Sequence, residues 1–210
     1  MSANSIRPAR LIGVLGTNTE VGKTWVASQL IATLRLRGAR VAARKPVQSY
    51  APDDIYTDAA RLAGASGEEI ADICPAHRWY PVAMAPPMAA DALGRGPVRM
   101  QELINEIHWP PGIDIGLVET VGGARSPLAF DGDSMQLIER LHVDQVLLVA
   151  DAGLGTINAV RLCLDALSGK AVTVLLNRFD GSDRLHLANR EWLERRAGVP
   201  IAIDAAVLAE

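Results

Sequence analysis

Aromatic residues, excess charge of one sign and long apolar runs are all scarce in this chain. Aromatic residues make up about 4% of its 210 residues, too few for a platform on which single-stranded nucleic acid could stack. The net charge of −3 provides no basic surface for nucleic acid or for an anionic membrane. No run reaches the roughly eighteen apolar residues that a membrane span needs. We therefore expect a small-molecule partner, with no nucleic acid and no membrane.

Cysteine is also rare. Cys74 and Cys163 lie far apart and match no metal-ligand spacing. Cys163 lies in an apolar helical run, which predicts a place in the core. The first ten residues lack the apolar core of a secretory signal. These features predict a reduced, cytoplasmic protein.

The most informative stretch is residues 11–24, LIGVLGTNTEVGKT. It predicts a short apolar strand, a tight loop, and a helix that begins near Gly22-Lys23-Thr24. This is the plan of a P-loop, in which backbone N–H groups surround phosphates, a lysine reaches the outer phosphates and a hydroxyl binds Mg²⁺. A strict G-x-x-x-x-G-K-[ST] pattern narrowly fails, because Thr17 occupies its first position and the nearest glycine is Gly16.

Apolar strands alternate with amphipathic helices along the rest of the chain. The pattern predicts an α/β fold: a single domain over residues 1–210, with an open parallel sheet and helices on both faces. We expect a helix over 25–38 whose apolar face includes Trp25, Val26, Leu30, Leu34 and Leu36. Residues 39–47 predict a second strand.

Polar residues at the ends of these segments are candidate site residues. Lys45 lies at the end of the second predicted strand, at the sheet edge where open α/β sheets bind ligands. Glu119 ends the apolar run 113–120, as a carboxylate for Mg²⁺ would. Thr57 is a candidate N-cap, and Asp58 after it suits either the helix dipole or Mg²⁺. Asn177, at a later strand end, could read the edge of a base.

Four separated motifs resemble the ATP-dependent dethiobiotin synthetase family: GTNTEVGKT, KPVQS, the TDA at 57–59 and the ET-GG at 119–123. The later LGTIN and Asn177 extend the resemblance over roughly residues 10 to 205. It implies an ATP- and Mg²⁺-dependent ligase of biotin biosynthesis. In that reaction 7,8-diaminononanoate takes up CO₂ as a carbamate, ATP phosphorylates the carbamate, and the second amine closes a cyclic urea.

The resemblance also implies a role for each matching residue. It places Lys23 on the β- and γ-phosphates, Lys45 on the carbamate and the transferring phosphoryl group, and Thr19 and Ser49 beside the carbamate. Mg²⁺ would be held by Thr24, Asp58 and Glu119. ATP would contact Thr19, Glu20, Val21, Gly22, Lys23, Thr24 and Asn177. The substrate would contact Ser49, Leu154, Gly155 and Asn158, with its carboxylate bound across a homodimer interface.

Two departures from the family pattern fall near the expected substrate. Thr120 and Val121 replace the smaller residues of the usual E-G-A-G-G, and Tyr50 stands where glycine usually follows Ser49. Three alternatives therefore stay open: a related ligase acting on another amine or carboxylate, a paralogue that binds nucleotide without turnover, and a ParA-like nucleotide switch. The lysine that begins the ParA-type loop is absent here.

Overall fold

Six parallel strands form the central sheet of the protein, which is described here by a computed structural model of residues 7–209. Across the sheet the strands follow the order β10-β9-β8-β1-β5-β2. Their bounds are Arg10–Gly16 for β1, Val41–Arg44 for β2, Ile115–Gly123 for β5, Gln145–Asp151 for β8, Val172–Asn177 for β9 and Ile201–Ala202 for β10. The predicted open parallel α/β sheet is confirmed.

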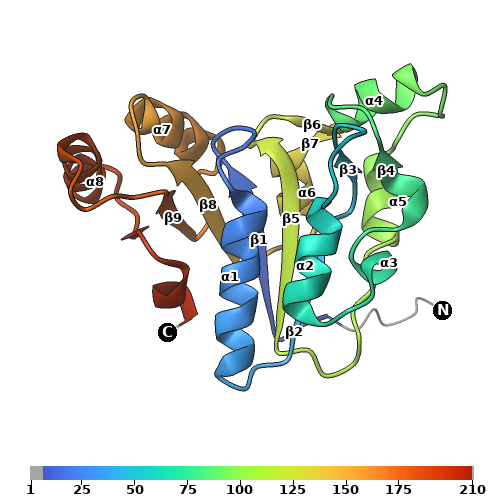
Figure 1. Cartoon of the computed structure of the whole chain (residues 1–210), viewed down its shortest axis with the longest axis horizontal. Helices are drawn as coiled ribbons and strands as arrows, with labels where there is room; N and C mark the ends of the chain where they lie inside the picture. The colour runs from blue at the N-terminus through green and yellow to red at the C-terminus, as the bar shows by residue number, and fades with distance from the viewer. Residues whose placement is uncertain (1–6, 210) are drawn as a thin grey trace.

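Eight α-helices are described, together with two short two-stranded sheets (Figure 1). The helices are α1 Lys23–Leu36, α2 Asp58–Ser66, α3 Ile70–Ile73, α4 Pro86–Ala92, α5 Met100–Asn105, α6 Ser134–Arg140, α7 Thr156–Ala166 and α8 Arg184–Arg196, with 3₁₀ turns η1 Ala76–Arg78 and η2 Ala205–Ala209. The short strands are β3 Gln48–Ser49 with β4 Trp79–Tyr80, and β6 Pro127–Ala129 with β7 Gly132–Asp133. Within residues 7–209, no helix has the length and apolar content that crossing a membrane requires.

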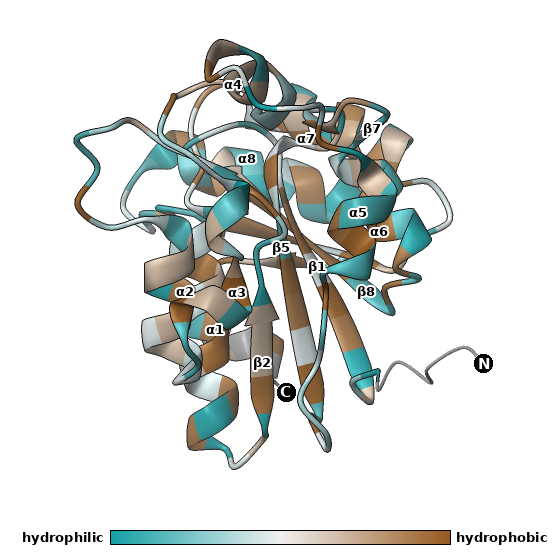
Figure 2. Cartoon of the chain, turned by 90° about the vertical axis from the view of Figure 1, so that its right-hand side faces the viewer, coloured by the Kyte–Doolittle hydropathy of each residue, from teal (hydrophilic) through white to brown (hydrophobic). Residues whose placement is uncertain are grey.

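Helices cover both faces of the sheet. In β1, Ile12 and Val14 pack on the face covered by α1 and α2, whereas Leu11 and Leu15 pack on the opposite face. This alternation is the period of two that a strand imposes on its side chains. Figure 1 shows α1 and α2 in front of the sheet and α6 behind it. Figure 2 shows that the central strands are largely hydrophobic, as strands buried on both faces must be.

The predicted apolar face of α1 is partly wrong. Val26, Leu30 and Leu34 are buried, but Trp25 is 56% exposed and Leu36 is 89% exposed. At roughly 100° per residue, the two exposed side chains lie about 150–170° around the helix from the centre of the buried stripe. Ala27 and Ile31 complete the stripe instead. An apolar residue inside the helix was therefore no sufficient sign of burial.

The second strand is shorter than the predicted segment 39–47. β2 ends at Arg44, and Lys45 follows it, with its N–H bonded to the carbonyl of Ile73. Pro46 has no N–H to continue the ladder, and the chain turns away so that Gln48 and Ser49 pair with β4. This turn directs Lys45 inward at the carboxyl end of the sheet.

The corrected face of α1 predicts a sharp contrast between two leucines of one helix. Leu30→Ala should lower the free energy of unfolding by about 2–5 kcal/mol, because a cavity replaces a fully buried side chain. Leu36→Ala should change it by less than about 0.5 kcal/mol, since the side chain is exposed. Urea unfolding followed by circular dichroism measures both. Equal losses would show that the register of α1 is wrong.

Candidate functional site

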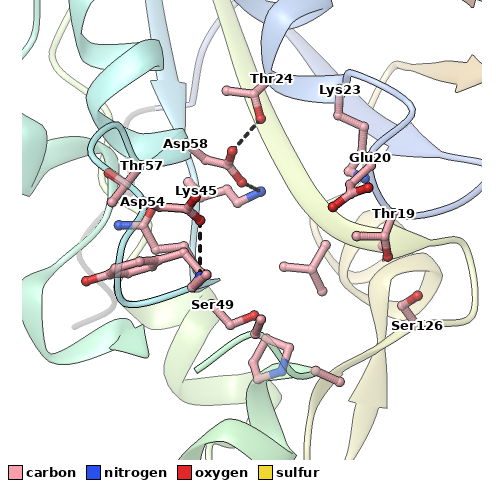
Figure 3. Close-up of a pocket in the computed structure, with 18 of the residues that line it drawn as sticks. Thr19, Glu20, Lys23, Thr24, Lys45, Ser49, Asp54, Thr57, Asp58 and Ser126 are labelled. Atoms are coloured by element: carbon pink, nitrogen blue, oxygen red, sulfur yellow. Dashed lines mark hydrogen bonds and ion pairs between the residues drawn. The ribbon is translucent and has the colours of Figure 1, made fainter. Parts of the chain in front are cut away.

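A cleft of about 920 Å³ opens at the carboxyl end of the sheet. Its walls come from the β1–α1 loop, the segment after β2, the start of α2 and the turn after β5, as Figure 3 shows in part. β1 lies between β8 and β5, where successive strands change sides of the sheet, and such a switch point is where open α/β sheets bind ligands. The predicted residues that line the cleft are Thr19, Glu20, Gly22, Lys23, Thr24, Lys45, Ser49 and Asp58.

The β1–α1 loop has the backbone of a phosphate cradle. Gly22 adopts φ 89°, and a Cβ at this position would lie 2.2 Å from the side-chain nitrogen of Asn177, so glycine is required. Within residues 7–209, the backbone N–H groups of Glu20, Val21 and Gly22 have no protein acceptor. Donors left free at a helix N-terminus form an anion-binding site.

Lys23 follows this loop and its side chain is almost fully buried. Its Nζ donates to the carbonyl of Asn18 at 3.1 Å. Burial, together with the positive charge of Lys45, lowers the pKa of Lys23 to about 8. An anion in the cleft would offset both effects, because it would return a counter-charge to an ammonium that has lost its water.

Side chains from α1, α2 and β5 meet next to the β1–α1 loop. The Thr24 hydroxyl lies 2.8 Å from Oδ1 of Asp58 and 2.8 Å from Oε1 of Glu119. Thr57 caps α2 through its side chain, as predicted, and so fixes Asp58 in the first turn. Glu119 lies in the middle of β5, which continues to Gly123 beyond the predicted strand end, and it is 1% exposed. Thr24, Asp58 and Glu119, far apart in sequence, are therefore neighbours in space.

Lys45 lies between the two carboxylates. Its Nζ is 2.8 Å from Oδ2 of Asp58 and 2.6 Å from Oε1 of Glu119, and it also donates to the carbonyl of Thr120. Figure 3 shows Asp58 in contact with both Thr24 and Lys45. Burial alone would lower the pKa of Lys45, but the two carboxylates raise it. The same ammonium keeps the pKa of Asp58 below its usual value despite burial. Lys45 is therefore a fixed positive charge.

This donor set fits a small divalent cation. A hydroxyl has one hydrogen, so Thr24 can donate to only one of the two carboxylates it touches. Oε2 of Glu119 is buried and has no hydrogen-bond partner. Among residues 7–209 no group of three or more His, Cys, Asp or Glu side chains could hold a metal. Two carboxylates and a hydroxyl are a partial set, and Mg²⁺ commonly completes such a set with water and substrate phosphates.

The two departures from the family pattern leave the cleft open. Among the described residues, the non-glycine residues with positive φ are Glu20, His142 and Arg178, so Tyr50 needs no glycine-like backbone. Tyr50 lines the cleft beside Ser49, whose hydroxyl donates to the carbonyl of Met84. Thr120 is fully buried and donates to the carbonyl of Val14. Of the two substituted residues, Val121 lines the cleft and Thr120 does not.

Asn177 belongs to a second cavity of about 690 Å³ next to Gly22. Trp25, Phe179 and Ile203 contribute apolar surface to this cavity. The side-chain nitrogen of Asn177 donates to the carbonyl of Val21 at 2.9 Å. Asn177 thus supports the phosphate-binding loop, in addition to its expected role of reading a base.

Leu154, Gly155 and Asn158 lie apart from these residues. They are exposed at the start of α7 and line neither cavity, with Leu154 91% exposed. Sequence reasoning missed Ser126 and Arg178, which line the main cleft. Ser126 follows a Gly-rich turn and accepts the N–H of Gly123. Arg178 directly follows Asn177 at a strand end, which was the one available signal for it.

Comparison with known proteins agrees with this geometry. The family model described as "AAA domain" matches residues 10–204. The chain is 36% identical over 195 residues to the ATP-dependent dethiobiotin synthetase BioD of Haloferax mediterranei, covering 90% of this chain and 80% of that protein. It is 34% identical over 204 residues to the BioD of Mycobacterium bovis, covering 93% and 87%.

Solved structures with low sequence identity share the fold. A ParA family ATPase from Chlorobium tepidum superposes with a TM-score of 0.54 at 14% identity, covering 95% of this chain and 83% of that one. The signal recognition particle receptor FtsY of Elizabethkingia anophelis gives a TM-score of 0.54 at 16% identity, covering 93% and 58%. These two similarities concern the fold alone.

The contacts of Lys45 predict an asymmetric effect on stability. Lys45→Met keeps the bulk of the side chain but leaves Glu119 buried without a counter-charge, which should lower the free energy of unfolding by about 3 kcal/mol. The double variant Lys45→Met/Glu119→Gln should recover at least half of this loss, because it removes the orphaned charge. Denaturant unfolding without added metal measures both. If the double variant is the less stable one, the ion pair is not the dominant interaction.

Proposed function

The chain belongs to the ATP-dependent dethiobiotin synthetase family, and we propose that its main cleft closes a cyclic urea from 7,8-diaminononanoate and CO₂ with ATP. The observation that carries this proposal is the position of Thr24, Asp58, Glu119 and Lys45. They form one charged centre directly beside a phosphate-binding loop. Phosphoryl transfer depends mainly on positioning and on positive charge around the γ-phosphate, and this centre has the parts to supply both.

The β1–α1 loop holds the triphosphate in this proposal. The free N–H groups of residues 20–22 and the N-terminus of α1 surround the phosphates. Lys23 places its ammonium on the β- and γ-phosphates, and the new counter-charge restores a pKa that burial had lowered. Asn177 and the apolar second cavity receive the adenine base.

Asp58, Glu119 and the hydroxyl of Thr24 hold Mg²⁺ in this proposal. The support is the unpartnered oxygen of Glu119 and the single hydroxyl hydrogen shared by two carboxylates. Bound Mg²⁺ would supply charge neutralisation for the transferring phosphoryl group. Lys45, which contacts both carboxylates, would share its positive charge with the carbamate oxygen.

Ring closure follows from proximity. The carbamate oxygen attacks the γ-phosphorus and displaces ADP. The second amine then attacks the activated carbon, loses a proton and releases phosphate. Thr19 and Ser49 lie on the walls of the same cleft, where they can hold the carbamate and the free amine together. Holding reacting groups in place can contribute about 7–11 kcal/mol to lowering the barrier.

We also propose a homodimer in which the start of α7 serves the neighbouring subunit. Leu154, Gly155 and Asn158 are exposed and line neither cavity of their own chain. A substrate carboxylate that they bind would therefore belong to a partner's cleft. The single-domain organisation of residues 1–210 and a cytoplasmic location remain predictions.

The function predicts phosphate release that depends on two co-substrates. Purified protein with Mg²⁺ and ATP should release phosphate only when bicarbonate and 7,8-diaminononanoate are both present, and mass spectrometry should detect the cyclic urea. Diamine-independent release would favour a nucleotide switch. Nucleotide binding without turnover would identify a non-catalytic paralogue, and turnover with a different amine or carboxylate would identify a related ligase.

Lys45→Met tests the role of Lys45 in the same assay. It should bind Mg²⁺ and an ATP analogue about as tightly as the wild type, because the β1–α1 loop is intact, and this binding also shows that it is folded. Its phosphate release should fall by at least about a hundredfold, as expected when one charge that stabilises the transition state is removed. Loss of nucleotide binding would contradict the role proposed for Lys45.

A further inference from the structure

Arg178 joins two loops that are distant in sequence. Its Nη2 donates to the carbonyl of Glu20 in the β1–α1 loop at 2.8 Å, and its Nη1 donates to Oδ2 of Asp151 at 3.0 Å. Asp151 is the last residue of β8, and its other oxygen accepts the N–H of Gly153 at 2.9 Å. An unbroken chain of hydrogen bonds therefore runs from the phosphate-binding loop to the turn that begins α7.

The local backbone shows that this arrangement is specific. Arg178 has φ 56° and Glu20 has φ 61°, a left-handed conformation that non-glycine residues seldom adopt. Such conformations persist where surrounding contacts determine them, and they concentrate at functional sites. Two such residues are held against each other here by the bond from Arg178 to the Glu20 carbonyl.

Neighbouring contacts strengthen both ends of the chain. Asn177, the last residue of β9, donates to the carbonyl of Val21, so Asn177 and the next residue, Arg178, hold consecutive carbonyls of the phosphate-binding loop. Because the C=O and N–H of one trans peptide unit point in opposite directions, the N–H groups of Val21 and Gly22 point away from Arg178 and Asn177. At the other end, the buried Asn189 of α8 donates to the carbonyls of Ala152 and Gly153. The turn is thus anchored from α8 as well as from Asp151.

We propose that Arg178 and Asp151 are a positioning pair that transmits nucleotide binding from the phosphate-binding loop to residues 152–158. A triphosphate fixes the N–H groups of the loop, and Arg178 carries this restraint through Asp151 to the turn. The importance of residues 152–158 for the substrate carboxylate rests on the proposed function. In a homodimer, nucleotide in one subunit would then order the carboxylate site of the other.

Arg178 also lines both cavities. Together with Gly22, it lies between the expected triphosphate and the expected base. Two parallel contacts require the fork of a guanidinium, which a lysine ammonium cannot reproduce. Arg178→Lys should therefore keep the contact to one loop and lose the connection between the two.

The test is amide hydrogen exchange of peptides that cover residues 151–158, measured with and without Mg²⁺ and a slowly hydrolysed ATP analogue at saturation. In the wild type, the analogue should slow exchange in this segment by about tenfold. Arg178→Ala and Asp151→Asn should each abolish the slowing, the double variant should add nothing further, and Arg178→Lys should restore little of it. Arg178→Ala should also weaken analogue binding by about three- to tenfold.

Arg40→Ala is the matched control. The pair of Arg40 and Asp114 has the same 3.0 Å separation and similar exposure, but it lies at the opposite end of the sheet. Arg40→Ala should leave unchanged both the protection of residues 151–158 and the affinity for the ATP analogue. Absence of slowing in the wild type, or slowing that persists in Arg178→Ala, would overturn the inference. The exchange experiment contains no diamine, so it is independent of the phosphate-release assay. If the enzyme turns over but the analogue does not protect residues 151–158, only this inference is refuted. If the analogue protects them but the enzyme does not turn over, only the proposed function is refuted.

Discussion

The site depends on one ammonium held between two carboxylates. Lys45 can occupy this position because β2 ends at Arg44 and the chain then turns inward at Pro46. Without Lys45, Asp58 and Glu119 would be two negative charges at the buried end of a sheet, an arrangement with a large electrostatic cost. With it, they form a neutralised but incompletely satisfied centre that can exchange partners when phosphate and a divalent cation arrive.

The parallel sheet makes this centre possible. In a parallel sheet the carboxyl ends of the strands lie along one edge, so the β1–α1 loop, Lys45 and Glu119 converge although up to about a hundred residues separate them. The helices on both faces exclude water from the strands, and this burial lowers the pKa of Lys23. Asp58 and Glu119 raise the pKa of Lys45 despite the same burial. The fold of this protein therefore determines the electrostatics of its site.

Strong periodicity and strand-end chemistry made much of this arrangement predictable. The parallel sheet and the cap at Thr57 follow from local patterns, because buried parallel strands and helix caps have clear sequence signatures. The proximity of Thr24, Asp58 and Glu119 was implied by the family resemblance. The exposure of Trp25 and Leu36 could not be predicted from local patterns, since two apolar residues within a helix do not show which side of the helix faces the sheet. The bond from Arg178 to Glu20 could not be predicted, because it joins loops about 160 residues apart through a left-handed backbone.

In the proposed reaction a carbamate, and not water, receives the γ-phosphoryl group. An ¹⁸O label tests it directly: the enzyme, Mg²⁺, ATP and diamine are mixed with ¹⁸O-labelled bicarbonate and quenched rapidly. The ¹⁸O content of the released phosphate is then measured by mass spectrometry. If the carbamate is phosphorylated, one labelled oxygen passes from CO₂ into phosphate and another remains in the carbonyl of the cyclic urea. Unlabelled phosphate, with its new oxygen from water, would contradict the account.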